Sequence, residues 1–190
     1  QAKDEAPVEE TWPKTFTVTL AGDTTLGSTD DLRKRDDCFE NVAQEKGYGW
    51  FFSGLADLFG SDDLTLVNFE GTLTESTYVP SSKKNNEFLF SAPPEYVNML
   101  TENGVEAVSL ENNHVLDHGE DAYIETQTHL SNAGVVWSGD GQLGVIEVKG
   151  VKIAMLSYLC IINNRSDDLR LKRIINNPPR GLGAKTIETA

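Results

Sequence analysis

Apolar and polar positions alternate along the chain in short β-rich runs, which are separated by stretches with helical spacing. The runs at 15–21, 64–70 and 105–110 predict three strands. The first run breaks at Gly22 and the second ends at Gly71, so a turn is expected after each. Strands that alternate with helices indicate an α/β domain with a substantially parallel sheet.

Three stretches have the features of helices. Apolar residues recur at helical spacing over 50–60, a proline pair opens the stretch 93–104, and acidic residues occupy the first turn of 119–134. Each of the three stretches ends at a glycine. The segments 28–49 and 75–87 are polar, and we expect them to be irregular.

The end of the domain returns to β-rich sequence. A short strand is predicted over 135–139, and 144–159 predicts two strands around a tight turn at Lys149 and Gly150. From 161 onward the composition changes, because residues 161–190 contain six Lys or Arg against three Asp or Glu, and the first 160 contain ten against 27.

The composition divides the chain into three parts. The polar opening, which contains two prolines, predicts a linker or tether over 1–14. Residues 15–160 form the predicted α/β domain, and 161–190 are expected to be a divergent or truncated ending. Two cysteines, Cys38 and Cys160, could form a disulfide or remain thiols, and the spacing leaves both open.

The charge limits the classes of partner. The chain has 16 Lys and Arg against 30 Asp and Glu, a formal net charge of −14. A nucleic-acid backbone is therefore an unfavourable partner, because phosphate binding needs basic patches. No window approaches the roughly 18 apolar residues of a membrane helix.

Three predicted strand ends carry side chains that can bind a metal ion. Ligands of open α/β sheets bind at the carboxyl ends of the strands, and carboxylate, amide and imidazole groups suit Mg, Mn, Zn or Fe. Each group also has an ordinary interpretation as a turn or solvent-facing residue, so the pattern alone leaves both interpretations open. His118 and His129 are expected to be ordinary loop and helix residues. The strand-end residues are Asp23, Asn68, Glu70, Asn112, Asn113 and His114.

Three sequence blocks resemble those of a known family. "AGDTTLG", "VNFEGTLT" and "ENNHVLDHG" occur in the same order as the signature blocks of the CapA (PgsA) family, and the resemblance runs from 16 to 158. These proteins are associated with capsule and poly-γ-glutamate synthesis and are distant relatives of calcineurin-like metallophosphatases. The resemblance implies a metallophosphatase-like sheet with flanking helices, which would be half of an α/β/β/α sandwich.

The resemblance also implies a set of metal ligands. Asp23 matches the first metal-binding aspartate, Glu70 an acidic residue that approaches or bridges the metals, and Asn113 the metal-binding asparagine. Asn68 and Asn112 would hold these ligands in position without binding the metal themselves. The implied cofactor is a divalent metal, Mn, Zn, Mg or Fe, with one or two ions.

The catalytic residues implied by the resemblance are His114 and Asp117. His114 would protonate a leaving group or steady an oxyanion, and Asp117 would orient it. The chain departs from the pattern at Thr25, where relatives carry a histidine, and it has no histidine after His129. We therefore expect the N-terminal part of such a domain, with an incomplete metal site.

Two functions follow from the resemblance. The first is a metal-dependent hydrolase or transferase of capsule or poly-γ-glutamate metabolism. It would be extracellular or at the cell surface and anchored to the membrane in the full-length protein. The second is a non-catalytic scaffold of the polymer synthesis and export machinery. A weaker third interpretation is a serine-esterase-like hydrolase, with Thr24 at the nucleophile position. With this acidity, direct binding to a polyanionic polymer would require bridging metal ions.

Overall fold

The computed structural model describes residues 15–29, 31–83 and 88–155. The predicted tether at 1–14, the ending at 161–190 and Cys160 lie outside these ranges, so the predictions made for them stay predictions. None of the helices within the ranges has the length and apolar character that a membrane crossing requires.

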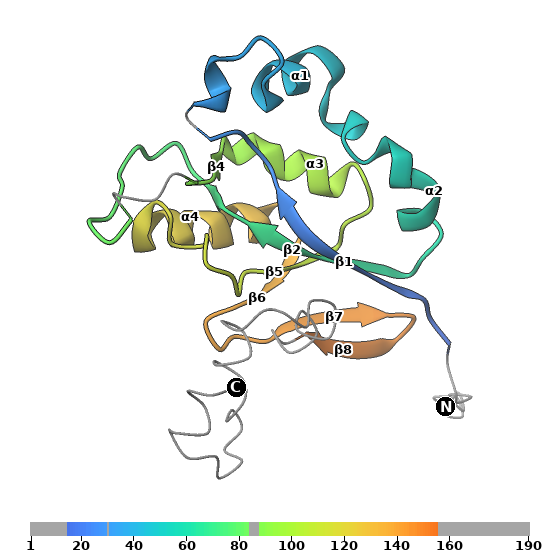
Figure 1. The fold of residues 1–190 in the computed structure, drawn as a ribbon. Coiled ribbons are helices and arrows are strands. Elements are labelled where there is room, and N and C mark those ends of the chain that lie inside the picture. Colours follow the sequence, from blue (N-terminus) through green and yellow to red (C-terminus); the bar gives the residue numbers. More distant parts are fainter. Residues whose placement is uncertain (1–14, 30, 84–87, 156–190) are drawn as a thin grey trace, which may run out of the picture.

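The centre of the molecule is a four-stranded sheet in which every pairing is parallel (Figure 1). The strand order is β1-β2-β5-β6. Helices connect the successive strands, so the predicted α/β fold with a parallel sheet is confirmed. The strands of this sheet are β1 (Val18–Thr25), β2 (Leu64–Glu70), β5 (Ala107–Ser109) and β6 (Val136–Ser138).

The first strand does not end at Gly22, as the glycine had suggested. Leu20 pairs with Leu66, and Asp23 pairs with Asn68, so β1 advances by one more residue than β2 between these pairs. This local bulge accommodates Gly22 without ending the strand. The added pairing with β2 carries Asp23 to the carboxyl end of the sheet.

The helices lie on one face of the sheet (Figure 1). The segment 28–49, which was expected to be irregular, contains a two-turn helix. The sequence pattern of this helix is weak because Ala43 is its only buried residue, so few of its positions need to be apolar. The helix predicted over 50–60 was too long, since only 56–59 are α-helical and 3₁₀ turns precede them. The elements are α1 (Phe39–Lys46), α2 (Ala56–Phe59), α3 (Val97–Thr101) and α4 (Gly119–Asn132), with 3₁₀ turns η1 (Leu32–Lys34), η2 (Tyr48–Trp50), η3 (Ser53–Leu55) and η4 (Pro94–Tyr96).

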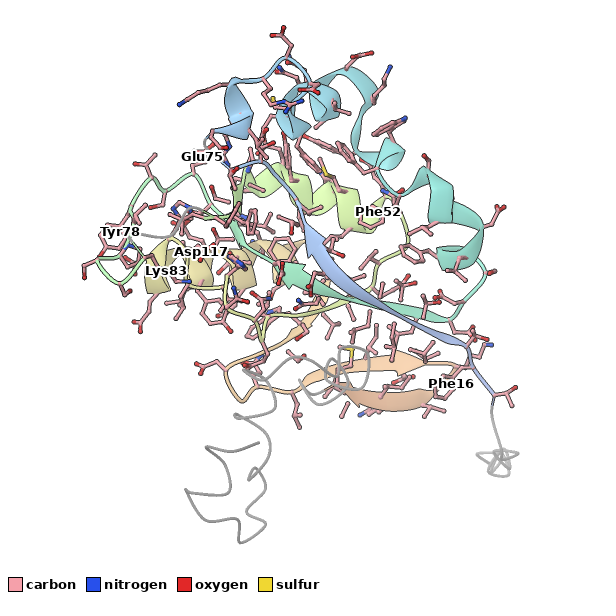
Figure 2. The ribbon with its side chains drawn as sticks, viewed as in Figure 1. Phe16, Phe52, Glu75, Tyr78, Lys83 and Asp117 are labelled. Atoms are coloured by element: carbon pink, nitrogen blue, oxygen red, sulfur yellow. The ribbon has the colours of Figure 1, made fainter. Side chains whose placement is uncertain are left out.

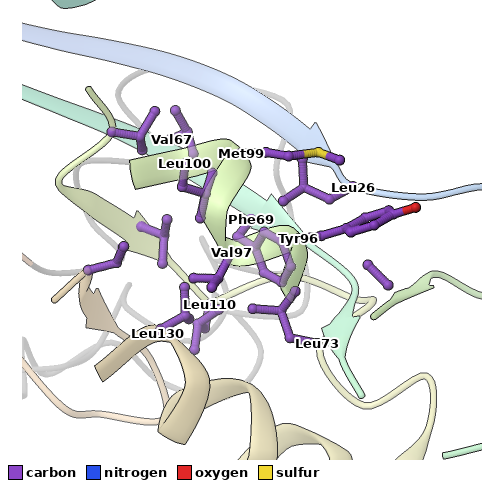
Figure 3. Close-up of a cluster of buried hydrophobic side chains, with 14 of the residues drawn as sticks. Leu26, Val67, Phe69, Leu73, Tyr96, Val97, Met99, Leu100, Leu110 and Leu130 are labelled. Atoms are coloured by element: carbon purple, nitrogen blue, oxygen red, sulfur yellow. The ribbon is translucent and has the colours of Figure 1, made fainter. Parts of the chain in front are cut away.

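Strand β2 is buried on both of its faces. Val67 and Phe69 point into the cluster beneath the helices (Figure 3), whereas Leu64 and Leu66 belong to a second cluster on the opposite face. Alternate residues of a strand face opposite sides. A strand covered on both sides therefore reads as a near-continuous apolar run, as β2 does.

An antiparallel hairpin covers the face opposite the helices. Val148 and Met155 pack there against Leu64 and Leu66. Lys149 has φ 49° and Gly150 has φ 78°, the conformation of the tight two-residue turn that the sequence predicted. The resulting layers of helices, parallel sheet and hairpin are consistent with a metallophosphatase-like α/β fold. The hairpin strands are β7 (Gly144–Val148) and β8 (Val151–Met155).

A sharp bend follows β2 and brings two distant segments together. Gly71 has φ 120°, and a Cβ at this position would lie 3.0 Å from the Phe90 Cβ and 3.1 Å from the Phe90 carbonyl oxygen. Only glycine adopts this conformation and allows this approach without strain. Two short strands, β3 (Thr72–Leu73) and β4 (Ser91–Ala92), then pair in parallel beside the main sheet.

A threonine of α4 fastens β3 to the helix layer. The Leu73 backbone N–H donates to Thr126 Oγ1 at 2.8 Å, in a buried position. Thr126→Val keeps the shape but leaves this N–H unsatisfied, so we expect the free energy of unfolding to fall by about 1–3 kcal/mol in urea denaturation. Thr128→Val is the control, because both hydroxyls donate to the carbonyl four residues earlier but Thr128 is exposed. Equal losses in the two variants would contradict this account.

Candidate functional site

A row of polar side chains crosses the carboxyl end of the main sheet. Asn68 Nδ2 donates to Asp23 Oδ1 at 2.6 Å, and Asn112 Nδ2 donates to Asn68 Oδ1 at 3.1 Å. Asn112 Nδ2 also donates to the Phe69 carbonyl oxygen at 2.7 Å. The side chains of three predicted strand ends therefore form one continuous chain of hydrogen bonds.

The same row fixes the start of the loop that follows β5. The His114 backbone N–H donates to Asn112 Oδ1 at 2.9 Å, an Asx turn that reverses the chain. Asn112 is 3% exposed, so its amide is a rigid support. Asn112 thereby connects the strand ends to the backbone of His114.

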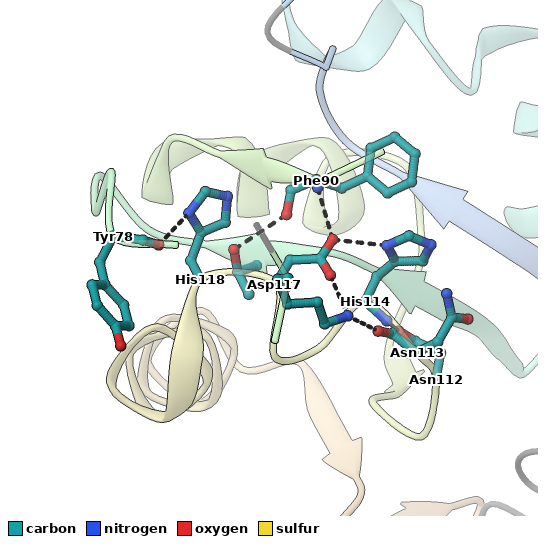
Figure 4. A network of polar contacts seen from close by, with 9 residues as sticks. Tyr78, Phe90, Asn112, Asn113, His114, Asp117 and His118 are labelled. Carbon is teal, nitrogen blue, oxygen red and sulfur yellow. Dashed lines mark hydrogen bonds and ion pairs between the residues drawn. The ribbon is translucent and has the colours of Figure 1, made fainter. Parts of the chain in front are cut away.

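The side chain of His114 contacts Asp117 within this turn (Figure 4). His114 Nδ1 lies 2.7 Å from Asp117 Oδ2. An ionised carboxylate can only accept, so Nδ1 carries the proton, and in the neutral ring Nε2 holds the lone pair. Nε2 makes no hydrogen bond to any residue of the described ranges. The predicted pairing of His114 and Asp117 is present, and it leaves Nε2 as the ring nitrogen available for a further contact.

The carboxylate of Asp117 is fully buried and receives three donors. Besides His114, Lys83 Nζ donates to Oδ1 at 2.8 Å and the Phe90 backbone N–H donates to Oδ2 at 2.9 Å. Burial alone would raise the pKa of Asp117, but the hydrogen bonds from His114, Lys83 and Phe90 together hold the pKa below its usual value. Asp117 is therefore ionised at neutral pH.

The ring of Phe90 packs against the imidazole of His114. The two ring centroids are 4.6 Å apart, with planes inclined at 59°. The imidazole therefore has an apolar wall on one side and Asp117 at its Nδ1 edge. Its side chain is 15% exposed, which leaves limited access from solvent.

Lys83 is a residue of this site that the sequence did not indicate. It lies in the segment 75–87, which was predicted as a loop from its composition, and no motif distinguishes it from its neighbours. Its Nζ donates to the Asn113 carbonyl oxygen at 2.7 Å in addition to Asp117. Figure 2 shows Lys83 and Asp117 together at this end of the molecule.

The predicted metal ligands do not assemble into a metal shell among the described residues. No group of three or more His, Cys, Asp or Glu side chains there converges on a position that could hold an ion. Asp23 Oδ1 accepts a hydrogen bond from Asn68 Nδ2, Glu70 ends β2 at the position opposite Thr25 of β1, and Asn113 is exposed in the loop after β5. Among the described residues, the carboxylate and imidazole groups therefore do not form an ion site by themselves, and the roles of Asp23, Glu70 and Asn113 as metal ligands stay predictions.

A cavity of about 550 Å³ opens beside Lys83. Its walls include Tyr78, Leu116 and His118, and its size is within the range of small-molecule sites. His118 Nδ1 donates to the Tyr78 carbonyl oxygen at 3.0 Å, which holds the segment before Lys83 against the start of α4. Lys83 therefore lies between this cavity and the buried Asp117 carboxylate, and neither His114 nor Asp117 lines the cavity.

Comparison with known proteins gives one short match and one long match. DNA helicase II of Haemophilus influenzae is 44% identical over 48 residues, which is 25% of this chain and 6% of the helicase. So short a stretch shows no family. The family model of the bacterial capsule synthesis protein PGA_cap matches residues 17–180, which include the whole described fold and its polar site. The chain therefore belongs to the PGA_cap family of bacterial capsule synthesis proteins.

Proposed function

We propose that the chain acts on the capsule polymer at the cell surface, with His114 as the general acid and base. It would break a bond of the polymer and pass the released group to water or to another acceptor. The observation that supports this most is the 2.7 Å contact between His114 Nδ1 and Asp117 Oδ2. A carboxylate that holds Nδ1–H orients the ring and stabilises the imidazolium that forms when Nε2 takes a proton. The proposed substrate is poly-γ-glutamate, the polymer with which the resembling family is associated.

The proposed chemistry requires two proton transfers at one nitrogen. His114 Nε2 takes a proton from a water molecule or an acceptor hydroxyl as the oxygen of that group attacks the carbonyl carbon of a γ-glutamyl amide. The same nitrogen then returns the proton to the leaving group, so the histidine ends as it began. Asp117 stays ionised throughout, because Lys83 and Phe90 continue to donate to it.

A second candidate is a non-catalytic scaffold of the polymer machinery. The incomplete set of metal donors among the described residues favours it. In that case the polar row would only stabilise the loop after β5, and the free Nε2 would have no chemical role.

The test is a cleavage assay with a matched histidine control. The chain is incubated with poly-γ-glutamate of defined length, with and without Mn²⁺ or Zn²⁺, and the polymer length is followed by size-exclusion chromatography. We expect His114→Asn to lower the rate by about 10²–10⁴-fold, the typical contribution of a general acid or base. His129→Asn, on α4 and away from the site, should leave the rate unchanged.

The outcomes separate the two candidates. Cleavage that His114→Asn abolishes and His129→Asn preserves supports the enzyme. No cleavage by the wild-type chain under any of these conditions, or equal rates in wild type and His114→Asn, overturns it in favour of the scaffold.

A further inference from the structure

We propose that Lys83 is a positioning residue for the His114–Asp117 pair, and that it fixes which nitrogen of His114 carries the proton. The catalytic meaning of this role rests on the proposed function, but the structural claim does not. The Lys83 ammonium donates to Asp117 Oδ1 at 2.8 Å and to the Asn113 carbonyl oxygen at 2.7 Å. It therefore bridges the partner of His114 and the peptide that precedes His114.

The first contact sets the plane of the carboxylate. Rotation of an aspartate carboxylate about its last torsion is only weakly restricted by the side chain itself. In this site Oδ2 is shared by His114 Nδ1 and the Phe90 N–H, and Oδ1 is held by Lys83. Contacts at both oxygens fix the plane, and they direct Oδ2 at the imidazole.

The second contact sets the position of the imidazole. The Asn113 carbonyl oxygen belongs to the peptide that leads into His114, and its N–H is held by Asn112. Lys83 and Asn112 therefore hold this one peptide from its two ends. A side chain from a different loop thus controls both halves of the pair.

The burial of these groups makes the role of Lys83 specific. Its side chain is 19% exposed and that of Asp117 is 0% exposed, so the ammonium satisfies Oδ1 at a position that is largely removed from water. Charge also matters, because the ammonium lies 2.8 Å from the carboxylate and balances its charge. Without it, the carboxylate would be held only at Oδ2 and would retain an unbalanced charge.

One buried carboxylate also joins the two arms of the long connection between β3 and β4. Lys83 comes from the outgoing arm and Phe90 from the returning arm, and both donate to Asp117. The ring of Phe90 in turn packs on His114. The arms and the histidine therefore form a single unit, and a change in one arm is expected to reach the imidazole.

The test uses NMR of the histidine side chains and needs no substrate. The chain contains three histidines, so ¹⁵N–¹H spectra of the rings are simple, and His114→Asn identifies the signals of His114. In the wild type we expect a slowly exchanging Nδ1 proton on His114. Lys83→Met should abolish this signal, and Lys83→Arg should preserve it. The control is Lys152→Met, an exposed lysine of β8, which should change nothing.

Each outcome decides the proposal. An unchanged Nδ1 signal in folded Lys83→Met overturns the positioning role. If Lys83→Met does not fold, Lys83→Ala, which also removes both the donor and the charge, is measured with the same criteria. Where the chain proves active, Lys83→Met should lower kcat by up to about a hundredfold without a matching rise in KM. If the wild type is inactive and Lys83→Met still loses the Nδ1 signal, the result contradicts the proposed function and leaves the positioning role intact.

Discussion

Asp117→Ala is expected to lower the free energy of unfolding by about 3–5 kcal/mol, the usual cost of removing one partner from a buried ion pair. The substitution leaves the Lys83 ammonium beside an apolar methyl group, although its side chain is only 19% exposed. It also leaves the Phe90 backbone N–H without its acceptor. Urea denaturation monitored by circular dichroism measures the loss.

A double-mutant cycle shows whether the unpaired ammonium is the cause. Asp117→Ala combined with Lys83→Met removes both charges, so the pair of changes should cost about 0.5–3 kcal/mol less than the sum of the single changes. A double variant whose loss equals that sum would contradict this explanation.

The pH dependence of stability in a second variant, Asp117→Asn, provides an independent check. The folded-state pKa of Asp117 is lowered, so its ionised form stabilises the fold above the unfolded-state pKa of about 3.9. This stabilisation is lost as the pH falls through the folded-state value. The difference in free energy of unfolding between wild type and Asp117→Asn should therefore be largest at pH 7 and should decrease in acid. A difference that is the same at pH 7 and pH 3 would show that ionisation of Asp117 has no role.

The architecture could be predicted where short-range patterns and tertiary structure agree. The apolar run of β2, the helix α4 with its acidic first turn, and the turn at Lys149 and Gly150 each have a local signal, and each is present. The prediction was wrong where tertiary pairing overrides the local signal. Gly22 is the main case, because the local signal predicted a turn there, whereas pairing with β2 continues the strand through a bulge.

The candidate site could be predicted in part for a similar reason. His114 and Asp117 are three residues apart in one turn, so the sequence alone keeps them within reach of each other. The row from Asp23 through Asn68 to Asn112 follows from the rule that parallel strands end at the same edge. The roles of these residues as metal ligands or supports stay predictions, because the described residues do not enclose an ion.

Lys83 shows the limit of sequence reasoning for this site. It meets Asp117 from a segment that is 34 positions away along the chain, and it lies in a polar loop without periodicity. A contact of this kind depends on how Gly71 bends the chain and where Phe90 returns beside it. Loop composition indicates none of these events, so only the fold reveals the third member of the group.

Phe69→Ala is expected to lower the free energy of unfolding by about 3–5 kcal/mol, the typical cost of deleting a large aromatic side chain from a core. Phe69 is 1% exposed and lies in the cluster between β2 and the helices (Figure 3). Its loss leaves a cavity that the close-packed neighbours Leu73 and Leu100 cannot fill without moving. Phe88→Ala, at a position that is 63% exposed, is the matched control and should change stability by less than about 0.5 kcal/mol.

The same variant tests whether the core and the polar site are coupled. The Phe69 carbonyl oxygen accepts from Asn112, and Asn112 in turn holds the backbone of His114. If the core collapses into the vacated space, β2 must shift and the His114 ring signals should shift with it in NMR spectra. If the cavity stays open, stability falls but the ring signals stay in place. A loss of less than about 1 kcal/mol in the free energy of unfolding, with unchanged spectra, would contradict the placement of Phe69 in the core. Truncation of a buried phenylalanine costs more stability than that.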